Sequence, residues 1–280
     1  MRRSFPLPGH AAEVAARLGD PDAAPPTPRP AATVVLVRDG DRGVEVFLLR
    51  RRASMAFAAG MSVFPGGGVD PRDTADDVPW AGADADRWGA WLGCSPREAR
   101  GYVCAAVRET FEECGVLLAG ADATGPVCAV DAPEWEEERQ RLLSRERAMS
   151  DVLRSRGLVL RADLLRPWAH WTTPVHEPRR YDTRFLLAVL PEGQQARHVG
   201  EESDESGWYA ASDVVDLAAH GDVLLMPPTL VTLEEVAAAA DTEALWAQPR
   251  RLREVLPVIE RRGEALVVVA DLPDQPPRAP

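Results

Sequence analysis

The chain has 280 residues, of which 45% are apolar and 27% are charged. This composition is typical of a globular protein with a buried core, and it excludes a chain that is disordered along its whole length. Acidic residues outnumber basic ones by 44 to 32, and the net charge of −12 disfavours general binding to nucleic acids or anionic lipids.

The sequence also predicts the compartment. No stretch approaches the roughly 20 apolar residues that span a bilayer, and the first residues lack the apolar centre of a signal peptide. The four cysteines form no C-x-x-C pair, which favours reduced thiols. Every basic residue is arginine, so catalysis through a Schiff-base lysine is excluded. We expect a cytoplasmic protein without a membrane partner.

Residues 1–30 are predicted to be an N-terminal segment that ends in a proline-rich connector. A single compact domain is expected over 31–270, followed by a tail at 271–280. Within the domain, β-branched runs at 33–38 and 44–50 flank an Asp-Gly turn and predict a hairpin of central strands.

Strands and helices alternate over the rest of the domain. Further strands are predicted at 168–173, 184–190 and 208–209, helices at 213–219, 230–240 and 242–246, and a closing hairpin from 252–259 and 265–270. This alternation predicts an α/β architecture.

A glycine-rich turn and an irregular segment lie between the first hairpin and the longest helix. Gly66, Gly67 and Gly68 follow Phe64-Pro65 and permit backbone shapes that other residues avoid. Residues 70–99 show no regular period, so we expect an inserted loop with one helical turn near 88–92.

The longest helix is predicted to begin after Ser95 and to end at Gly115. Ser95 is a suitable N-cap, a proline follows it, and Glu98 completes a capping box. One face of this helix is apolar and consists of Val103, Ala106, Val107, Thr110 and Cys114.

Three carboxylates lie together on another face of the same helix. Glu109, Glu112 and Glu113 are related by i, i+3 and i+4, which places them within one turn. Three clustered carboxylates repel one another unless a cation lies among them, and their oxygens suit Mg²⁺ or Mn²⁺. An acidic helix face is more often simply solvated. The preceding glycines, the adjacent Arg108 and the final Gly115 favour a functional site here.

The nine residues from Arg108 resemble the second half of the Nudix box, R-E-x-x-E-E-x-G followed by an apolar residue, and Phe64-Pro65-Gly66-Gly67 resembles its start. The resemblance implies a Nudix hydrolase with an α/β/α sandwich on a mixed β-sheet, here with extra helices. It implies that Glu109, Glu112 and Glu113 are catalytic ligands of Mg²⁺ or Mn²⁺. One of the three is also a candidate base, and Arg108 would orient a glutamate by ion pairing.

The box is interrupted in this chain, because residues 70–99 separate its glycine half from its glutamate half. In addition, Arg100 stands where the family has a glutamate, eight residues before the Arg-Glu pair. That glutamate is structural in the family. Asp70, Asp73 and Glu98 are the candidates to replace it, and the sequence leaves the choice open.

The interruption of the box is a trait by which this chain resembles the peroxisomal coenzyme A diphosphatase branch of the Nudix family. Further similarities to that branch are Trp171–Pro174, Arg180–Phe185, Glu202, Glu205, Trp208 and Leu225–Thr229. The resemblance implies cleavage of coenzyme A or acyl-CoA to 4′-phosphopantetheine, or its acyl form, and adenosine 3′,5′-bisphosphate. The alternatives are a diphosphatase for NADH or ADP-ribose, and a Nudix-fold module that binds a nucleotide without turnover.

Several other residues are candidates for the site. Arg50, Arg52 and Arg184 could bind substrate phosphates, because guanidinium groups match phosphate geometry, and Gly66 and Gly67 could approach the substrate closely. Glu205 is a candidate additional metal ligand, as is Glu202. A charged helix predicted at 134–156 is expected to face solvent, with a lid or a homodimer interface as the alternative.

Overall fold

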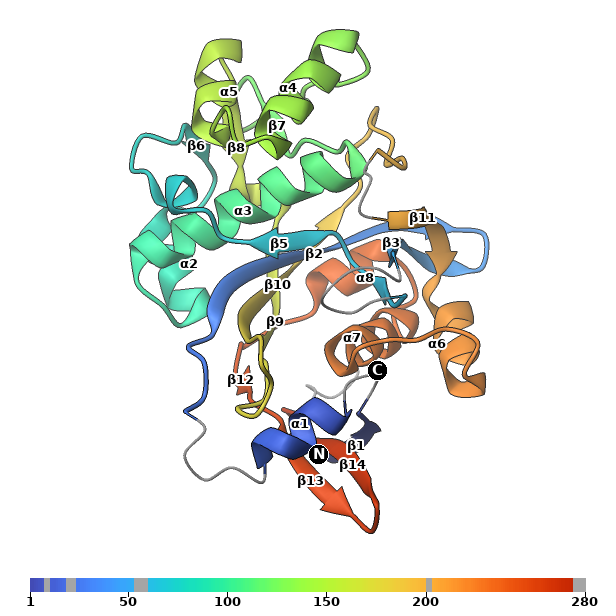
Figure 1. Cartoon of the computed structure of the whole chain (residues 1–280). Helices are drawn as coiled ribbons and strands as arrows, with labels where there is room; N and C mark the ends of the chain where they lie inside the picture. The colour runs from blue at the N-terminus through green and yellow to red at the C-terminus, as the bar shows by residue number, and fades with distance from the viewer. Residues whose placement is uncertain (8–10, 19–23, 53–59, 200–202, 274–280) are drawn as a thin grey trace.

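A mixed β-sheet forms the centre of the molecule (Figure 1). The computed structural model describes residues 1–7, 11–18, 24–52, 60–199 and 203–273. The sheet is built from β2 (Arg29–Gly40), β3 (Gly43–Arg51), β4 (Ser62–Val63), β5 (Gly66–Gly68), β9 (Arg166–Thr172), β10 (Tyr181–Val189), β11 (Ser203–Ala210) and β12 (Glu254–Val255). The strand order is β11-β3-β2-β10-β9-β12, with β4 beside β3 and β5 beside β2. The β2–β10 and β9–β12 pairs are parallel and the other pairs are antiparallel.

The hairpin predicted from the first two apolar runs is confirmed. Val37 pairs with Val46, and the turn closes at Gly40 and Gly43. Side chains on both faces of β2 are buried, as Val34 and Val35 show. Because successive residues of a strand point to opposite faces, this burial requires cover on both sides of the sheet.

Helices supply that cover and complete the predicted α/β/α arrangement (Figure 1). On one face, α2 (Ala85–Leu92) and α3 (Pro96–Cys114) pack over Val34, Leu36 and Phe47. The other face carries α6 (Ala211–His220), α7 (Pro227–Ala237) and α8 (Thr242–Ala247). The strands and helices predicted between 168 and 246 are therefore confirmed, with bounds shifted by a few residues.

Helix α3 begins and ends as its local sequence predicts. The Ser95 hydroxyl accepts a hydrogen bond from the Glu98 amide, and the Glu98 carboxylate accepts one from the Ser95 amide. The helix ends at Gly115, whose φ of +71° lies in the left-handed region that favours glycine. All five residues of the predicted apolar face are buried.

The inserted segment contains more structure than the expected single turn. It forms the 3₁₀ helix η1 (Pro71–Thr74), the short strand β6 (Trp80–Ala81) and α2. Strand β6 joins β7 (Ala119–Gly120) and β8 (Val159–Arg161) in a small separate sheet, and η2 (Ala162–Leu164) follows β8. Both η1 and α2 contact α3, so the insertion is packed against this helix.

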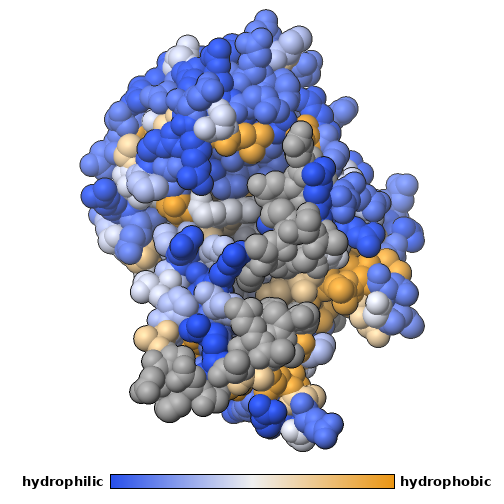
Figure 2. Space-filling view, in the orientation of Figure 1, coloured by the Kyte–Doolittle hydropathy of each residue, from blue (hydrophilic) through white to orange (hydrophobic). Residues whose placement is uncertain are grey.

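The prediction of a single helix over 134–156 is wrong, because two helices occupy this segment. These are α4 (Pro133–Leu143) and α5 (Met149–Arg156). Arg145 lies between them with a φ of +60°, a left-handed conformation that ends a helix. Trp135 and Leu142 of α4 are buried. The surface over both helices is mainly hydrophilic, so their other sides face solvent (Figure 2).

The two ends of the described chain pair with each other. Strand β1 (Arg2–Pro6), which the sequence did not predict, pairs with β14 (Ala265–Asp271), and β13 (Val258–Arg262) pairs with the other edge of β14. Helix α1 (Ala11–Leu18) packs Val14 against this sheet.

The predicted closing hairpin is only partly confirmed, because β12 takes the first part of its first strand into the main sheet. Pro257 separates β12 from β13, and proline cannot donate a ladder hydrogen bond. Within the described residues, no helix is both long and apolar enough to cross a bilayer.

Candidate active site

Strand β5 brings the glycine turn directly onto the acidic face of α3. The amide of Gly66 donates a hydrogen bond of 2.7 Å to the Glu113 carboxylate. A Cβ atom at Gly67 would lie 2.5 Å from the Glu109 carboxyl carbon, and one at Gly66 would lie 2.5 Å from the Ala32 carbonyl oxygen. Real Cβ atoms do not approach other atoms so closely, so Gly66, which faces backbone, requires glycine, and a Cβ at Gly67 would force the Glu109 carboxylate to move. The two halves of the interrupted box therefore meet in space.

Arg108 lies at the centre of the acidic cluster and is 9% exposed. Its Nη1 donates to Glu109 at 2.7 Å and to Glu112 at 3.2 Å, and its Nη2 donates to the Gly68 carbonyl at 2.8 Å. Burial opposes the charge of Arg108, but the surrounding carboxylates outweigh it and raise the pKa of the guanidinium above its ordinary value. This network gives Arg108 the orienting contacts that the sequence implied.

Of the three candidates to replace the missing glutamate, Asp73 is the one that pairs with Arg108. Its carboxylate, 2% exposed, accepts hydrogen bonds from Arg108 Nε at 3.2 Å and Nη2 at 3.0 Å. Asp70 instead caps η1 and pairs with Arg72, which lowers the pKa of Asp70 to about 2. Glu98 is engaged in the capping box of α3. The insertion thus places a carboxylate against Arg108, and we expect Asp73 to take the role of the glutamate that the helix lacks at Arg100.

Glu112 is the most unusual carboxylate of the cluster. It is 6% exposed, and its Oε1 is buried without a hydrogen-bond partner among the described residues. Burial raises the pKa of its carboxyl to about 7, although the nearby charge of Arg108 acts in the opposite direction. A buried oxygen without a partner is costly, and such groups often mark functional sites.

These side chains fit a divalent cation by their chemistry. Glu109, Glu112 and Glu113 supply hard oxygen donors, and the orphaned Oε1 of Glu112 could coordinate a cation. Within the ranges that the structure describes, no group of three or more His, Cys, Asp or Glu side chains is already spaced to hold a metal. Arg108 Nη1 donates to both Glu109 and Glu112, so these two carboxylates would have to shift in order to coordinate an ion together.

Arg184 lies in a separate buried cluster. It is 4% exposed, its Nη1 pairs with Asp182, and its Nε donates to the Leu92 carbonyl at 3.2 Å. Tyr102 and His170 also hydrogen-bond to Asp182, at 2.8 and 2.6 Å. Burial opposes ionisation of Asp182, but these partners lower its pKa to about 2. The contacts of Arg184 are those of a residue that joins α2, α3 and β10.

Arg50, Arg52 and Glu205 lie where β3 meets β11. Arg50 is opposite Glu205 in the strand register, and Arg52 forms an exposed ion pair with Asp204 at 3.4 Å. Arg50 lies two residues after Leu48 in β3, so both side chains point to the same face of the sheet. Leu48 packs on the face away from α3. The structure therefore does not place Arg50 on the acidic face, and substrate binding by Arg50 and Arg52 stays a prediction. Glu202 lies outside the described residues.

One contact to the acidic helix has no counterpart among the sequence-based expectations. The Nη1 of Arg139, on α4, donates a hydrogen bond of 2.8 Å to the backbone carbonyl of Glu112. Arg139 is 2% exposed and stands in a run of charged residues that is typical of a solvated face. Its partner is 27 residues away, so no local spacing signals the contact.

Comparison with known proteins agrees with this geometry. The family model described as the NUDT19 Nudix domain matches residues 92–236. The crystal structure of a NUDIX hydrolase from Alicyclobacillus acidocaldarius is 31% identical, with a TM-score of 0.67, and the match covers 80% of this chain and 98% of that one. The range that the family model matches includes α3 and its three glutamates.

Two similar curated proteins also have NUDT19 in their names. Acyl-coenzyme A diphosphatase NUDT19 from Xenopus laevis is 25% identical over 72% of this chain and 62% of that protein. The protein of that name from Homo sapiens is 26% identical over 83% of this chain and 68% of its own length. The chain thus spans less than two thirds of the Xenopus relative.

Proposed function

The chain belongs to the Nudix hydrolase family, and on that premise we propose that it hydrolyses the diphosphate linkage of a nucleoside diphosphate derivative. We propose coenzyme A or an acyl-CoA as the substrate. The products would be 4′-phosphopantetheine, or its acyl form, and adenosine 3′,5′-bisphosphate.

The observation that carries this proposal is the meeting of β5 with the acidic face of α3. Gly66 hydrogen-bonds to Glu113, Gly67 lies against Glu109, and Arg108 ties Glu109 and Glu112 to Asp73. Residues from three separate segments converge on one group of carboxylates. A solvated acidic helix face would not need glycines packed against it or a buried arginine among its acids.

Uncatalysed hydrolysis of a diphosphate is slow, because its negative oxygens repel a nucleophile. A divalent cation, Mg²⁺ or Mn²⁺, would neutralise this charge and lower the pKa of a bound water. Glu109, Glu112 and Glu113 would hold it. Arg108 and Asp73 keep the carboxylates in place, and a glutamate near the site could accept the proton of the attacking water.

Coenzyme A is the first candidate because of the relatives. The family model and both curated relatives carry the NUDT19 description, and those relatives are named acyl-coenzyme A diphosphatases. The region that the family model matches in this chain contains α3.

Product analysis by mass spectrometry tests the proposal. The purified protein is incubated with Mg²⁺ or Mn²⁺ and with coenzyme A, acetyl-CoA, NADH or ADP-ribose in separate reactions. We expect adenosine 3′,5′-bisphosphate from the first two substrates, and none after EDTA is added. Oxygen-18 water places the label on one product phosphate and so identifies the attacked phosphorus.

The other outcomes discriminate between the alternatives. Cleavage of NADH or ADP-ribose alone would retain the hydrolytic centre and overturn coenzyme A as substrate. Nucleotide binding without any product in the presence of either metal would support a binding module instead.

A further inference from the structure

Helix α4 contacts the catalytic helix at the turn that carries the glutamates. An α-helix leaves the carbonyl groups of its last turn without partners inside the helix. At the end of α3, the Gly115 amide donates to the Phe111 carbonyl at 3.0 Å, and the Arg197 amide donates to the Cys114 carbonyl at 3.0 Å. The Glu112 carbonyl accepts from Arg139 at 2.8 Å. Arg139 is thus a side-chain cap that reaches this turn from another helix.

Arg139 is held so that one end of its guanidinium points at Glu112. Its Nε and Nη2 donate to the two carboxylate oxygens of Glu136, at 2.9 and 2.5 Å. A buried guanidinium is costly unless its donors are paired, and this bidentate pair leaves Nη1 for the carbonyl. A cation also interacts favourably with the negative end of a helix dipole. The same residue therefore fixes both the position and the electrostatics of this turn.

Aromatic packing fixes α4 itself against α3. Trp135, one turn before Arg139, meets Phe111 edge to face with 6.0 Å between ring centroids. The guanidinium of Arg156, on α5, lies over the Trp135 ring at 5.0 Å from its centroid. Phe111 directly precedes Glu112 in α3. The contact with α4 is therefore centred on the residues that carry the acidic cluster.

We propose that Arg139 is a positioning residue for the hydrolytic centre, which acts by fixing the backbone of Glu112 and thereby the direction of its carboxylate. The proposal rests on the proposed function in one respect, because it takes Glu112 as a ligand of a divalent cation. Arg139 touches neither the substrate nor the reacting atoms. Without it, the last turn of α3 would fray, and the three carboxylates would lose their common geometry.

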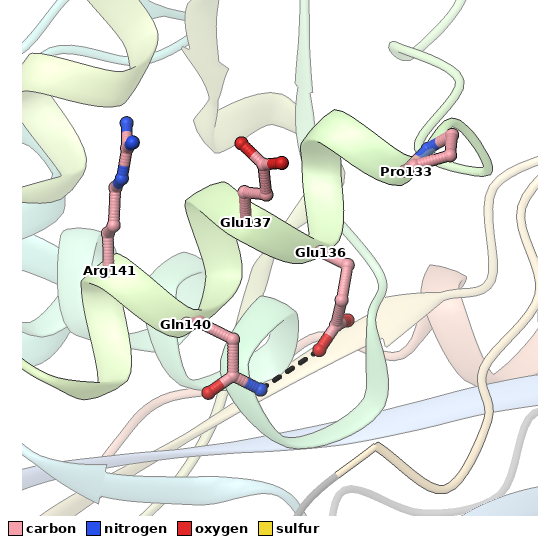
Figure 3. Close-up of a pocket in the computed structure, with 5 residues that line it drawn as sticks. All are labelled: Pro133, Glu136, Glu137, Gln140 and Arg141. Atoms are coloured by element: carbon pink, nitrogen blue, oxygen red, sulfur yellow. Dashed lines mark hydrogen bonds between the residues drawn. The ribbon is translucent and has the colours of Figure 1, made fainter.

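The test compares Arg139→Gln and Arg139→Lys with wild type and with Arg141→Gln as the matched control. Arg141 lies on the same helix, is exposed, and points away from Glu136 and Gln140 in Figure 3. Four quantities are measured for each protein: the melting temperature, the Kd for Mn²⁺ from electron paramagnetic resonance, and kcat and KM for the substrate that wild type cleaves. Mn²⁺ binding needs no turnover, so it tests Arg139 even if no substrate is cleaved.

We expect Arg139→Gln to weaken Mn²⁺ binding by about 10–100-fold and to lower kcat by a similar factor, with KM within about threefold of wild type, as for other residues that orient metal ligands. Arg139→Lys should retain more than Arg139→Gln, because lysine can still donate to the carbonyl. Arg141→Gln should match wild type. A folded Arg139→Gln protein with wild-type Mn²⁺ affinity and kcat would overturn the proposal.

Glu136→Gln keeps the proposal testable if Arg139→Gln does not fold. This variant removes the ion pair of Arg139, but the amide oxygen of the glutamine still accepts from the guanidinium, so Arg139 keeps its direction and its hydrogen bond to the Glu112 carbonyl. We expect a lower melting temperature with Mn²⁺ affinity close to wild type. Loss of Mn²⁺ affinity in proportion to the loss of stability would show that Arg139 only stabilises the fold, and would reject the positioning role.

Discussion

Glu112 combines two features that are unfavourable for a residue with only a structural role. Its carboxyl is buried, and one of its oxygens has no hydrogen-bond partner in the part of the chain that the structure describes. Ionising such a group in the protein interior is costly, which is why burial raises its pKa to about 7. A bound cation would remove both penalties, so the residue is poised for metal binding at the expense of stability in the metal-free protein.

The raised pKa of Glu112 predicts how the stability of the metal-free protein depends on pH. The folded state holds a proton on Glu112 more tightly than the unfolded state, whose carboxyl has the ordinary pKa of 4.5. The stabilisation is complete below that value and is lost as the pH rises through about 7. Relative to Glu112→Gln, wild type in EDTA should lose about 2 kcal/mol of unfolding free energy between about pH 5 and pH 8.

Denaturant unfolding at several pH values measures this difference directly. Saturating Mg²⁺ should abolish most of it, because the cation binds the ionised carboxylate and lowers its pKa. Parallel pH profiles for wild type and Glu112→Gln in EDTA would show that the Glu112 carboxyl titrates normally, and would refute its burial as an ionisable group.

Asp73 yields a second prediction at this scale. Removal of its charge leaves Arg108 buried with one carboxylate fewer, and breaking a buried ion pair costs about 3 kcal/mol. Asp73→Asn should therefore lower the free energy of unfolding by about this amount. It should also reduce kcat by about 10–100-fold, because Arg108 orients Glu109 and Glu112.

Asp76→Asn is the control for Asp73, because it changes an aspartate of the same insertion. The Asp76 side chain is 95% exposed and lies 3.7 Å from Arg100 in a loose surface pair, which contributes little to stability. The Asp76→Asn variant should have the same free energy of unfolding in urea and the same kcat and KM as wild type. If Asp73→Asn also matched wild type, the insertion would not supply the acid that replaces the family glutamate.

At the scale of elements, the site depends on how closely β5 approaches α3. Glycine lacks a Cβ atom, so the backbone of β5 can lie against the carboxylates and donate to Glu113. The strand pairs with β2 through Gly66, Gly67 and Gly68, which fixes its position beside β2 in the sheet. The glycines thus set the distance between two elements rather than the shape of a turn.

Gly67→Ala should disrupt the site while Gly68→Ala should not. The new Cβ at Gly67 would displace the Glu109 carboxylate, and misplacement of a catalytic group by about 1 Å costs about 10²-fold in rate. A Cβ at Gly68 meets no described residue within 4 Å. The two variants are compared by kcat and by melting temperature. Equal kcat values for both would contradict the close packing of β5 on Glu109.

The elements with local signals follow well from the sequence. Both ends of α3 agree with its caps within a residue, because Ser95, Glu98 and Gly115 act within one turn. The hairpin of β2 and β3 follows from alternation and an Asp-Gly turn. The break between α4 and α5 does not, because Arg145 adopts a left-handed conformation that sequence preferences do not favour for arginine.

At the scale of the whole molecule, the parts of the site that sequence reasoning left open depend on long-range contacts. The family box indicated Glu109, Glu112 and Glu113, but the choice among Asp70, Asp73 and Glu98 required the packing of η1 against α3. The Arg139 contact and the pairing of β1 with β14 are likewise non-local. Such contacts depend on which surfaces the folded chain buries together, and spacing along the sequence does not encode them.

At all three scales the central proposal is the same: the carboxylates that α3 presents to β5 would hold the centre that hydrolyses a nucleoside diphosphate derivative. The most direct test compares kcat/KM for wild type, Glu112→Gln and the control Glu137→Gln in saturating Mg²⁺. Glu137 is an exposed glutamate on α4, so its replacement changes the net charge equally without touching the cluster. The substrate is the one of coenzyme A, acetyl-CoA, NADH and ADP-ribose that wild type cleaves fastest.

We predict that Glu112→Gln lowers kcat/KM by about 10²–10⁴-fold, as expected for removal of a strong electrostatic group from a catalytic centre, and that Glu137→Gln stays within about twofold of wild type. Retention of wild-type kcat/KM by Glu112→Gln, or the absence of cleavage of all four substrates by wild type, would contradict the claim.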